Sequence, residues 1–215
     1  MIGRTKVLLV VAVVAATGIS TGAYSVPFYD NFNDGNLDGW TAAGTSVANG
    51  VAVQGGVDGY LYQAVSLDPL SPGEQYQFQF DFDNTLSSEA AFNSSFDVFF
   101  ASLYFTDTPG NPATPSALAG LDYLALFDQD SSGVALDTGG VCALAGGWSR
   151  YVLDFTTQHA YVIPIFEFYD LNNASDSQVR LDNVSLIPEP VTVTMLGGLA
   201  AGMWAARRLR RKTSR

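Results

Sequence analysis

The stretch Gln75-Tyr76-Gln77-Phe78-Gln79-Phe80-Asp81-Phe82-Asp83 alternates strictly between polar and aromatic side chains. Because successive side chains of a β-strand point to opposite faces, this stretch predicts a strand with one buried aromatic face and one wetted face. The composition of the 215-residue chain agrees: aromatic residues make up 13%, charged residues only 14%, and Gly is abundant. Such a composition favours strands over helices.

Other short runs of aromatic and β-branched residues, bounded by Gly, Pro, Asn, Asp and Ser, predict further strands. They are residues 51–54, 60–67, 96–105, 123–127, 151–155, 161–168 and 179–186. Helical periodicity is absent, so the expected fold is all-β, a jelly-roll-like antiparallel sandwich of about eight strands. Residues 106–120 are expected to form a long loop and 131–147 a Gly-rich connection. Pro164, which has no N–H, is expected at a sheet edge or bulge.

Charge is unevenly distributed along the chain, whose net charge is -11. The basic residues concentrate at the two ends, and the segment between them holds 20 of the 21 acidic residues but only Arg150 and Arg180. A domain this acidic repels nucleic acid and anionic lipid. Nucleic acid is therefore excluded as an expected partner.

The first 25 residues have the order of a secretory signal peptide. Arg4 and Lys6 precede the apolar run 7–16, and small residues follow. Cleavage is expected after Ala23 or Ser25. The alternative is an N-terminal membrane anchor, but the run is shorter than the ~20 residues that span a bilayer.

The last 28 residues, 188–215, form a second distinct segment. The residues between it and the signal peptide, 26–187, are expected to form the exported domain. Pro188-Glu189-Pro190 is followed by the uncharged, largely apolar residues 191–206. As a helix these would be roughly 24 Å long and could span the membrane marginally as a transmembrane helix. A basic stop at 207–215 should stay on the cytoplasmic side of the inner membrane. Its cations include Arg207, Arg208, Arg210, Arg211 and Lys212.

This tail resembles the PEP-CTERM sorting domain in its Pro-Glu-Pro motif, its short apolar helix and its terminal arginine cluster. The resemblance implies that an exosortase recognises and removes the tail in a Gram-negative bacterium that makes exopolysaccharide. The protein would then be held only transiently in the inner membrane and end in the cell envelope, on the surface or in the extracellular matrix. An ordinary permanent anchor is the alternative, but it leaves Pro188, Glu189 and Pro190 unexplained.

The exported domain carries a second resemblance, at residues 31–40, 148–155 and 181–185. These segments are similar to galactose-binding-like and carbohydrate-binding-module sandwiches. In that family a structural calcium often bridges the opening segment to an Asp on the last strand, which implies Asp182 here. Asn33 stands where the family often has an acidic residue, so its neutral oxygen would hold calcium less tightly.

Two further groups are candidates for ligand binding. The stretches 128–133, with Asp128 and Asp130, and 34–39 fit the first half of a calcium loop, although neither has the Glu at position twelve. The alternative for both is Asp and Gly in tight turns. Trp40 and Trp148 could stack against sugar rings, with packing in the core or at a sheet edge as their alternative role.

Enzyme chemistry has little support in the sequence. His159 is the only histidine, and no Gly-x-Ser-x-Gly turn in the exported domain at 26–187 presents a nucleophile, so the chain is predicted not to be an enzyme. A pair of carboxylates for glycoside hydrolysis stays open, since such pairs are recognised by their separation in space. Cys142 is the only cysteine and is expected to be a buried small hydrophobe.

The expected function is therefore that of an exported surface or matrix protein with a structural or adhesive role in the exopolysaccharide of a biofilm envelope. The alternative is a carbohydrate-binding module that recognises the exopolysaccharide. A secreted glycoside hydrolase is a third reading. No cofactor is expected beyond a possible structural calcium.

Overall fold

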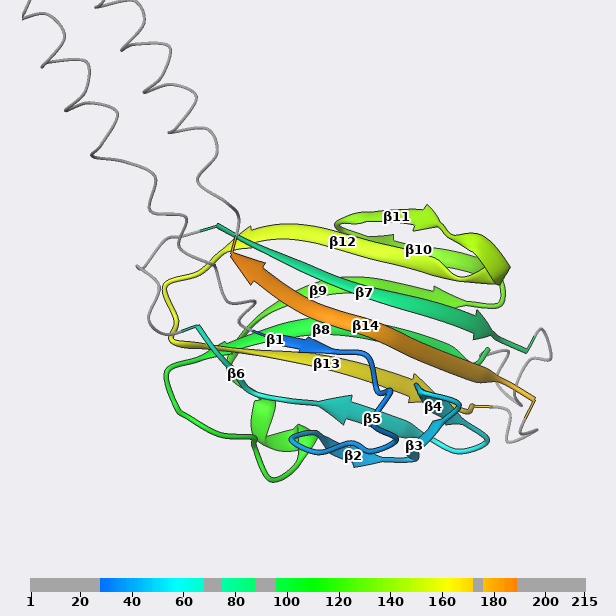
Figure 1. Cartoon of the computed structure of the whole chain (residues 1–215), viewed down its shortest axis with the longest axis horizontal. Coiled ribbons are helices and arrows are strands. Elements are labelled where there is room, and N and C mark those ends of the chain that lie inside the picture. The colour runs from blue at the N-terminus through cyan, green and yellow to red at the C-terminus, as the bar shows by residue number, and fades with distance from the viewer. Residues whose placement is uncertain (1–27, 68–74, 88–95, 172–175, 189–215) are drawn as a thin grey trace, which may run out of the picture.

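The computed structural model describes residues 28–67, 75–87, 96–171 and 176–188, which form two antiparallel sheets packed face to face (Figure 1). The all-β antiparallel sandwich expected from the sequence is confirmed. The predicted signal peptide and the predicted C-terminal helix lie outside the described residues. Within the described part, no helix is both long enough and apolar enough to cross a membrane.

Sheet A has seven strands. They are β1 (Phe28–Asp30), β3 (Thr45–Ala48), β4 (Val51–Gly55), β7 (Gln75–Thr85), β11 (Gly140–Ala143), β12 (Ser149–Thr156) and β14 (Gln178–Pro188). Their order is β11-β12-β7-β14-β4-β3, and β1 pairs with the part of β14 that lies beyond β4. The alternating stretch 75–83 thus lies in the central strand β7.

Sheet B also has seven strands. They are β2 (Thr41–Ala43), β5 (Gly59–Tyr62), β6 (Val65–Ser66), β8 (Val98–Thr106), β9 (Asp122–Asp130), β10 (Gly133–Asp137) and β13 (Tyr161–Tyr169). Their order is β10-β9-β8-β13-β5-β2, with β6 pairing along β13. Two short 3-10 helices, η1 (Pro115–Leu118) and η2 (Ala145–Gly147), lie in connections.

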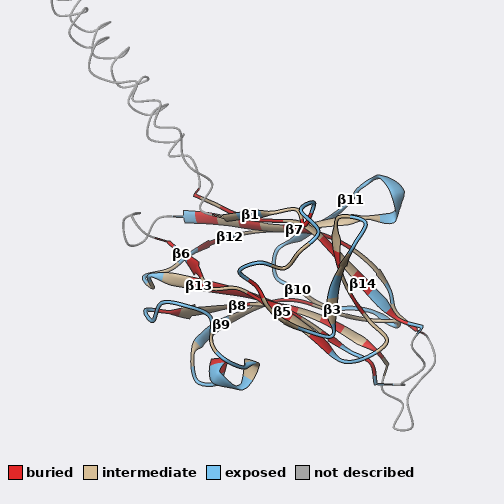
Figure 2. Ribbon diagram, turned by 60° about the horizontal axis from the view of Figure 1, so that its bottom comes forward, coloured by how far each residue is buried: buried red, intermediate tan, exposed pale blue. Residues whose placement is uncertain are grey.

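The core lies between the two sheets, where the buried residues gather (Figure 2). All four aromatic side chains of the alternating stretch point into it and are at most 4% exposed. The Phe80 ring packs against Phe166 of sheet B with centroids 5.0 Å apart. Burial of these rings contributes to the hydrophobic driving force for closing the sandwich.

Pro164 lies inside the central strand β13 rather than in an edge strand. On one side it pairs with Leu103 of β8. On the other side it faces the interruption between β5 and β6, where its carbonyl oxygen accepts a hydrogen bond from Gln63 N at 3.4 Å. Since proline has no N–H, it fits a central strand only where the neighbouring strand is interrupted.

The structure contains several short strands that the sequence patterns did not predict. The connection 131–147 contains β10 and β11, and the strands β1, β2 and β3 have only three or four residues each. Strands this short offer too few residues for a period of two, and most residues of β10 and β11 are exposed, so polar alternation is lost. Cys142, expected to be buried, is exposed on β11.

The expected loop at 106–120 folds over the outer face of sheet B. Leu118 of η1 is buried there against side chains that include Tyr62 and Ile163, in a second apolar cluster. The Tyr62 hydroxyl donates to Pro112 O at 2.8 Å. Asn111 ties the loop down further. Its Oδ1 accepts from Ala64 N at 2.6 Å, and its Nδ2 donates to Gly39 O and Thr41 Oγ1 at 2.8 and 3.1 Å.

Asn111→Ala is expected to loosen this loop without unfolding the sandwich. The change removes three hydrogen bonds to two other segments, a loss of about 1–2 kcal/mol in local stability because the site is exposed. Hydrogen-exchange mass spectrometry should show faster exchange confined to residues 107–121. Thr114→Ala is the control, since its exposed hydroxyl bonds only to Ser116 within the same loop. Equal exchange in both variants would contradict this role of Asn111.

Candidate aromatic binding face

The outer face of sheet B, turned away from the core, carries aromatic and acidic side chains from four neighbouring strands. We call this set the aromatic face. It consists of Tyr60, Phe100, Tyr104, Tyr123, Asp128, Glu167 and Tyr169. Tyr123 is 65% exposed, and Tyr169 is also exposed. The other five are partly buried. Two of them, Tyr60 and Tyr104, pack against the apolar cluster under the loop at 106–120, so the face is most open to solvent at Tyr123 and Tyr169.

Strand register places two carboxylates beside one aromatic ring. Phe100 on β8 lies directly opposite Asp128 on β9 and opposite Glu167 on β13. Glu167 in turn lies opposite Tyr60 on β5. Because neighbouring strands are about 4.8 Å apart and paired residues share a face, the two carboxylates flank the ring of Phe100.

Ring contacts hold the aromatic side chains in defined positions. Tyr104 and Tyr123 stack with centroids 5.6 Å apart and planes 26° from parallel. Phe100 meets Tyr169 edge to face at 5.8 Å. The Tyr169 hydroxyl donates to Glu167 Oε1 at 3.0 Å. Side chains on strands and in mutual contact are pre-organised, which lowers the entropy lost when a ligand binds.

Burial and a neighbouring acid raise the pKa of two tyrosine hydroxyls on this face. Burial, then the Glu167 carboxylate, raises the pKa of Tyr169 to about 12. Burial also raises the pKa of Tyr104, and Glu167 and Tyr123 add to the effect. The pKa of Asp128 is raised, first by burial and then by Asp130. Tyr104 and Tyr169 can therefore act as hydrogen-bond donors at neutral pH.

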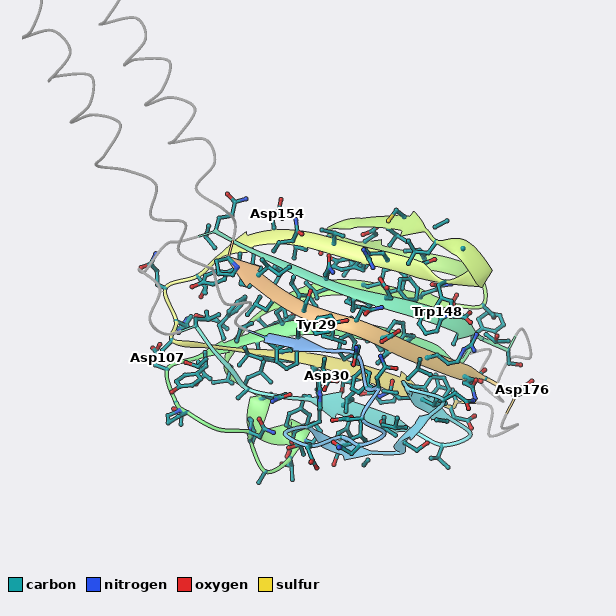
Figure 3. All side chains as sticks on the ribbon, viewed as in Figure 1. Tyr29, Asp30, Asp107, Trp148, Asp154 and Asp176 are labelled. Carbon is teal, nitrogen blue, oxygen red and sulfur yellow. The ribbon has the colours of Figure 1, made fainter. Side chains whose placement is uncertain are left out.

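The outer face of sheet A is polar, and its two arginines form ion pairs with Asp81 and Asp83. Arg150 Nε and Nη2 donate to Asp81 Oδ1 and Oδ2 at 2.6 and 2.9 Å. Asn183 Nδ2 donates to Asp81 Oδ2 at 3.0 Å, and the hydroxyl of Tyr29 donates to Asn183 Oδ1 at 2.7 Å. Asn183 lies in a bulge of β14 with a φ of 49°, where the backbone turns its side chain onto this face. Figure 3 shows Tyr29 above β14.

Trp148, one of the two tryptophans considered as candidates for stacking on sugar, lies on this polar side of the molecule, before β12 (Figure 3). The Arg180 guanidinium lies 5.3 Å from the centroid of its ring and also forms an ion pair with Asp83. This cation–π contact occupies one face of the ring, which a stacked sugar would have to share or displace.

Trp40, the other candidate, belongs to the core. It is only 8% exposed, and its ring packs edge to face on Phe28 at 5.6 Å and against Phe32 at 5.9 Å. Its Nε1 donates to Asp30 Oδ2 at 2.7 Å. Stacking against a sugar is therefore the wrong role for Trp40, and core packing, the alternative, is confirmed.

The strand β1, which directly precedes the opening segment 31–40, pairs with the last strand β14. Asp182 lies opposite Asp81, and burial, followed by the nearby acids Asp81 and Asp30, raises its pKa although a backbone N–H bond from Asn183 lowers it. Asn33 lies in the turn after β1. In the described ranges, no three His, Cys, Asp or Glu side chains form a group that could hold a metal ion.

The two calcium-loop candidates serve as turns in the structure. Asp130 Oδ1 accepts from both the N–H and the hydroxyl of Ser132, at 2.7 and 2.6 Å, where β9 turns into β10. In the other stretch, Asp34 Oδ1 accepts from Asn36 N at 3.2 Å, and Asn36 Oδ1 accepts from Asp38 N at 2.7 Å. Side chains that bond to the backbone two residues on are typical of tight turns.

His159 lies between two exposed carboxylates. Its ring nitrogens are 3.3 Å from Asp107 Oδ2 and from Asp122 Oδ2, and its ring stacks on Phe105. The N–H of Ala160 is the main cause of the lowered pKa of Asp107, and His159 contributes to it. Asp107 lies at the end of the sandwich opposite Trp148 (Figure 3).

The aromatic face was not predicted from the sequence. A signal for it does exist in the strand 96–105, where Phe99 and Phe100 are adjacent and therefore point to opposite faces. Phe99 is buried in the core, so Phe100 must extend the apolar surface outward. A strand with aromatic residues on both faces indicates either a second covered layer or a binding surface.

Comparisons with known proteins show similarity in structure only. No family model matches the sequence, and the comparison with curated proteins found no match. The carbohydrate recognition domain of Emp47p matches with a TM-score of 0.50 and 11% identity, over 80% of this chain and 99% of that chain. The CBM22-1 xylan-binding domain from Paenibacillus barcinonensis Xyn10C matches with a TM-score of 0.42 and 14% identity, over 77% and 95%.

Tailspike protein 4 of bacteriophage CBA120 also matches, with a TM-score of 0.47 and 14% identity over 74% of this chain. This chain spans only 20% of the tailspike chain. At such identities, structural likeness shows the fold and does not transfer a ligand or an activity. The chain therefore has the sandwich fold that it shares with the Emp47p carbohydrate recognition domain.

Proposed function

We propose that this chain is an exported protein that binds polysaccharide through its aromatic face. The observation that carries the proposal is the exposed Tyr123 ring, stacked on Tyr104 at one end of a sheet face whose other end holds Phe100 and Tyr169. Sugar rings have apolar C–H surfaces that pack on aromatic rings. Their hydroxyl groups can donate to carboxylates such as Glu167.

The sandwich fold supports this proposal, because solved carbohydrate-binding proteins, including the xylan-binding domain, are among the structures similar to this chain. That support is one of architecture alone. The aromatic face supplies the specific argument, since a row of aromatic residues on rigid strands presents a flat surface suited to an extended polymer.

The sequence supports the export half of the proposal. The signal peptide would direct the domain out of the cell, and the Pro-Glu-Pro tail would bring it to an exosortase at the inner membrane. A polysaccharide-binding domain delivered in this way would end in the envelope or in the exopolysaccharide matrix. There it would act as an adhesive protein by binding the polysaccharide. Mass spectrometry of the mature surface protein tests this half, and a C-terminus still at Arg215 would contradict it.

Tyr123→Ala is expected to weaken polysaccharide binding about tenfold, which corresponds to about 1.4 kcal/mol. The loss follows from removal of the most exposed ring of the aromatic face. The full-length protein in mild detergent would be titrated calorimetrically with cello-, xylo-, galacto- and N-acetylchito-oligosaccharides.

Trp148→Ala is the matched control, because Arg180 covers its ring on the opposite side of the sandwich. It should leave the affinity unchanged. A loss on Trp148→Ala with none on Tyr123→Ala would move the binding site to sheet A and overturn the assignment to the aromatic face.

A further inference from the structure

We propose that the aromatic face prefers polysaccharides that carry free amino groups over neutral polysaccharides and over those that contain uronic acids. This inference rests on the proposed function and adds the chemical class of the ligand. It follows from the sign and the position of the charges on sheet B, taken together with the rings beside them.

The charged side chains of sheet B are carboxylates. Asp128, Asp130 and Glu167 all lie on its strands, and no Lys or Arg lies on any strand of sheet B in the described residues. Both arginines of the described part lie on sheet A, where Asp81 and Asp83 pair with them. No cation therefore offsets the negative potential over the aromatic face.

The carboxylates lie where a stacked sugar would place its substituents. Glu167 and Asp128 lie on the two strands that flank Phe100, and Glu167 is bonded to the Tyr169 hydroxyl at 3.0 Å. An ammonium group on a sugar ring packed over Phe100 could therefore reach a carboxylate on either side. It would also lie beside aromatic rings, whose faces attract cations.

The other two classes of ligand fit this face less well. A uronic acid polymer would bring its carboxylates close to the carboxylates of Asp128 and Glu167. Like charges in contact repel, so this polymer should bind less tightly. A neutral polymer can form hydrogen bonds and pack on the rings but gains nothing from the excess negative charge. Preference for the amine thus follows from charge complementarity on a surface that also supplies the stacking rings.

The main test compares two ligands that differ only in the amine, and a uronic acid oligomer is the third ligand. Full-length protein in mild detergent is titrated with the β-1,4-linked hexaose of glucosamine, with the N-acetylated hexaose of the same linkage, and with oligogalacturonate. We expect the amine form to bind about tenfold more tightly than the N-acetylated form at low salt. Salt should narrow this difference, because exposed charges are screened. Oligogalacturonate should show no heat of binding.

Glu167→Gln tests the residue directly. The amide keeps an oxygen that can accept the Tyr169 hydrogen bond but removes the charge. We expect the affinity for the glucosamine hexaose to fall about threefold to tenfold. The affinity for the N-acetylated hexaose should fall less, because an amide oxygen still accepts hydrogen bonds from sugar hydroxyl groups but has no charge to attract an ammonium group. Asp154→Asn is the matched control, since it removes one exposed carboxylate from β12 of sheet A (Figure 3). It should change neither affinity.

The outcomes separate this inference from the proposed function. Equal affinities for the two hexaoses, tighter binding of the N-acetylated form, or equal losses in Glu167→Gln and Asp154→Asn would overturn the amine preference. Sugar binding that Tyr123→Ala weakens would still support the proposed function in those cases. Absence of binding to every oligosaccharide tested, neutral or charged, would overturn both.

Discussion

Phe80→Ala is expected to lower the free energy of unfolding by about 3–5 kcal/mol, because it opens a large cavity at the centre of the sandwich. Phe80 is fully buried on β7, between the two sheets. Its ring contacts five other aromatic rings: Phe78, Phe82, Phe99, Tyr151 and Phe166. Such a loss is a large share of the 5–15 kcal/mol typical of a folded domain. Urea unfolding followed by tryptophan fluorescence measures it.

Phe100→Ala is the matched control, since it makes the same chemical change on the outer face of sheet B. Phe100 is partly exposed and meets Tyr169 on one side, so less apolar surface returns to water and no closed cavity forms. We expect a cost of about 1 kcal/mol. Equal costs for the two variants would show that the aromatic stretch of β7 is not the centre of the core.

Arg150→Ala is expected to destabilise the protein by about 2–3 kcal/mol through the charge that it leaves behind. The side chain of Asp81 is only 6% exposed, and Arg150 supplies two of its hydrogen bonds, at 2.6 and 2.9 Å. Loss of the arginine leaves this carboxylate with Asn183 as its remaining side-chain donor. Removing one partner of a buried pair costs 3–5 kcal/mol, and the 35% exposure of Arg150 places the effect below that range.

Arg180→Ala is the control for this prediction. It removes a second arginine–aspartate pair from the same sheet face, but the Arg180 side chain is 41% exposed, so the cost should be about 0–1 kcal/mol. A double-mutant cycle supplies the second check. In an Asp81→Asn background, removal of Arg150 should have little effect, since no buried charge remains. Additive costs would rule out the explanation by an uncompensated carboxylate.

The candidate site shows the limit of local sequence patterns. Residue type alone made Trp40 and Trp148 candidates for stacking on sugar. In the structure, Trp40 packs in the core and the ring of Trp148 contacts Arg180. The surface that remains open is built from tyrosines and a phenylalanine on β5, β8, β9 and β13. These residues are far apart in the chain, and nothing in their immediate sequence neighbours shows that they share one face.

The alternation along β7 by itself determined the class of fold and the buried side of its central strand, because a period of two is a local property of extended backbone. The acidic balance of the middle segment was likewise readable from the residues alone. The tertiary structure decided which strands pair and in what register, and so placed Asp81 opposite Arg150 and Phe100 between Asp128 and Glu167. Register depends on contacts between residues distant in sequence, whose free energies no local pattern contains.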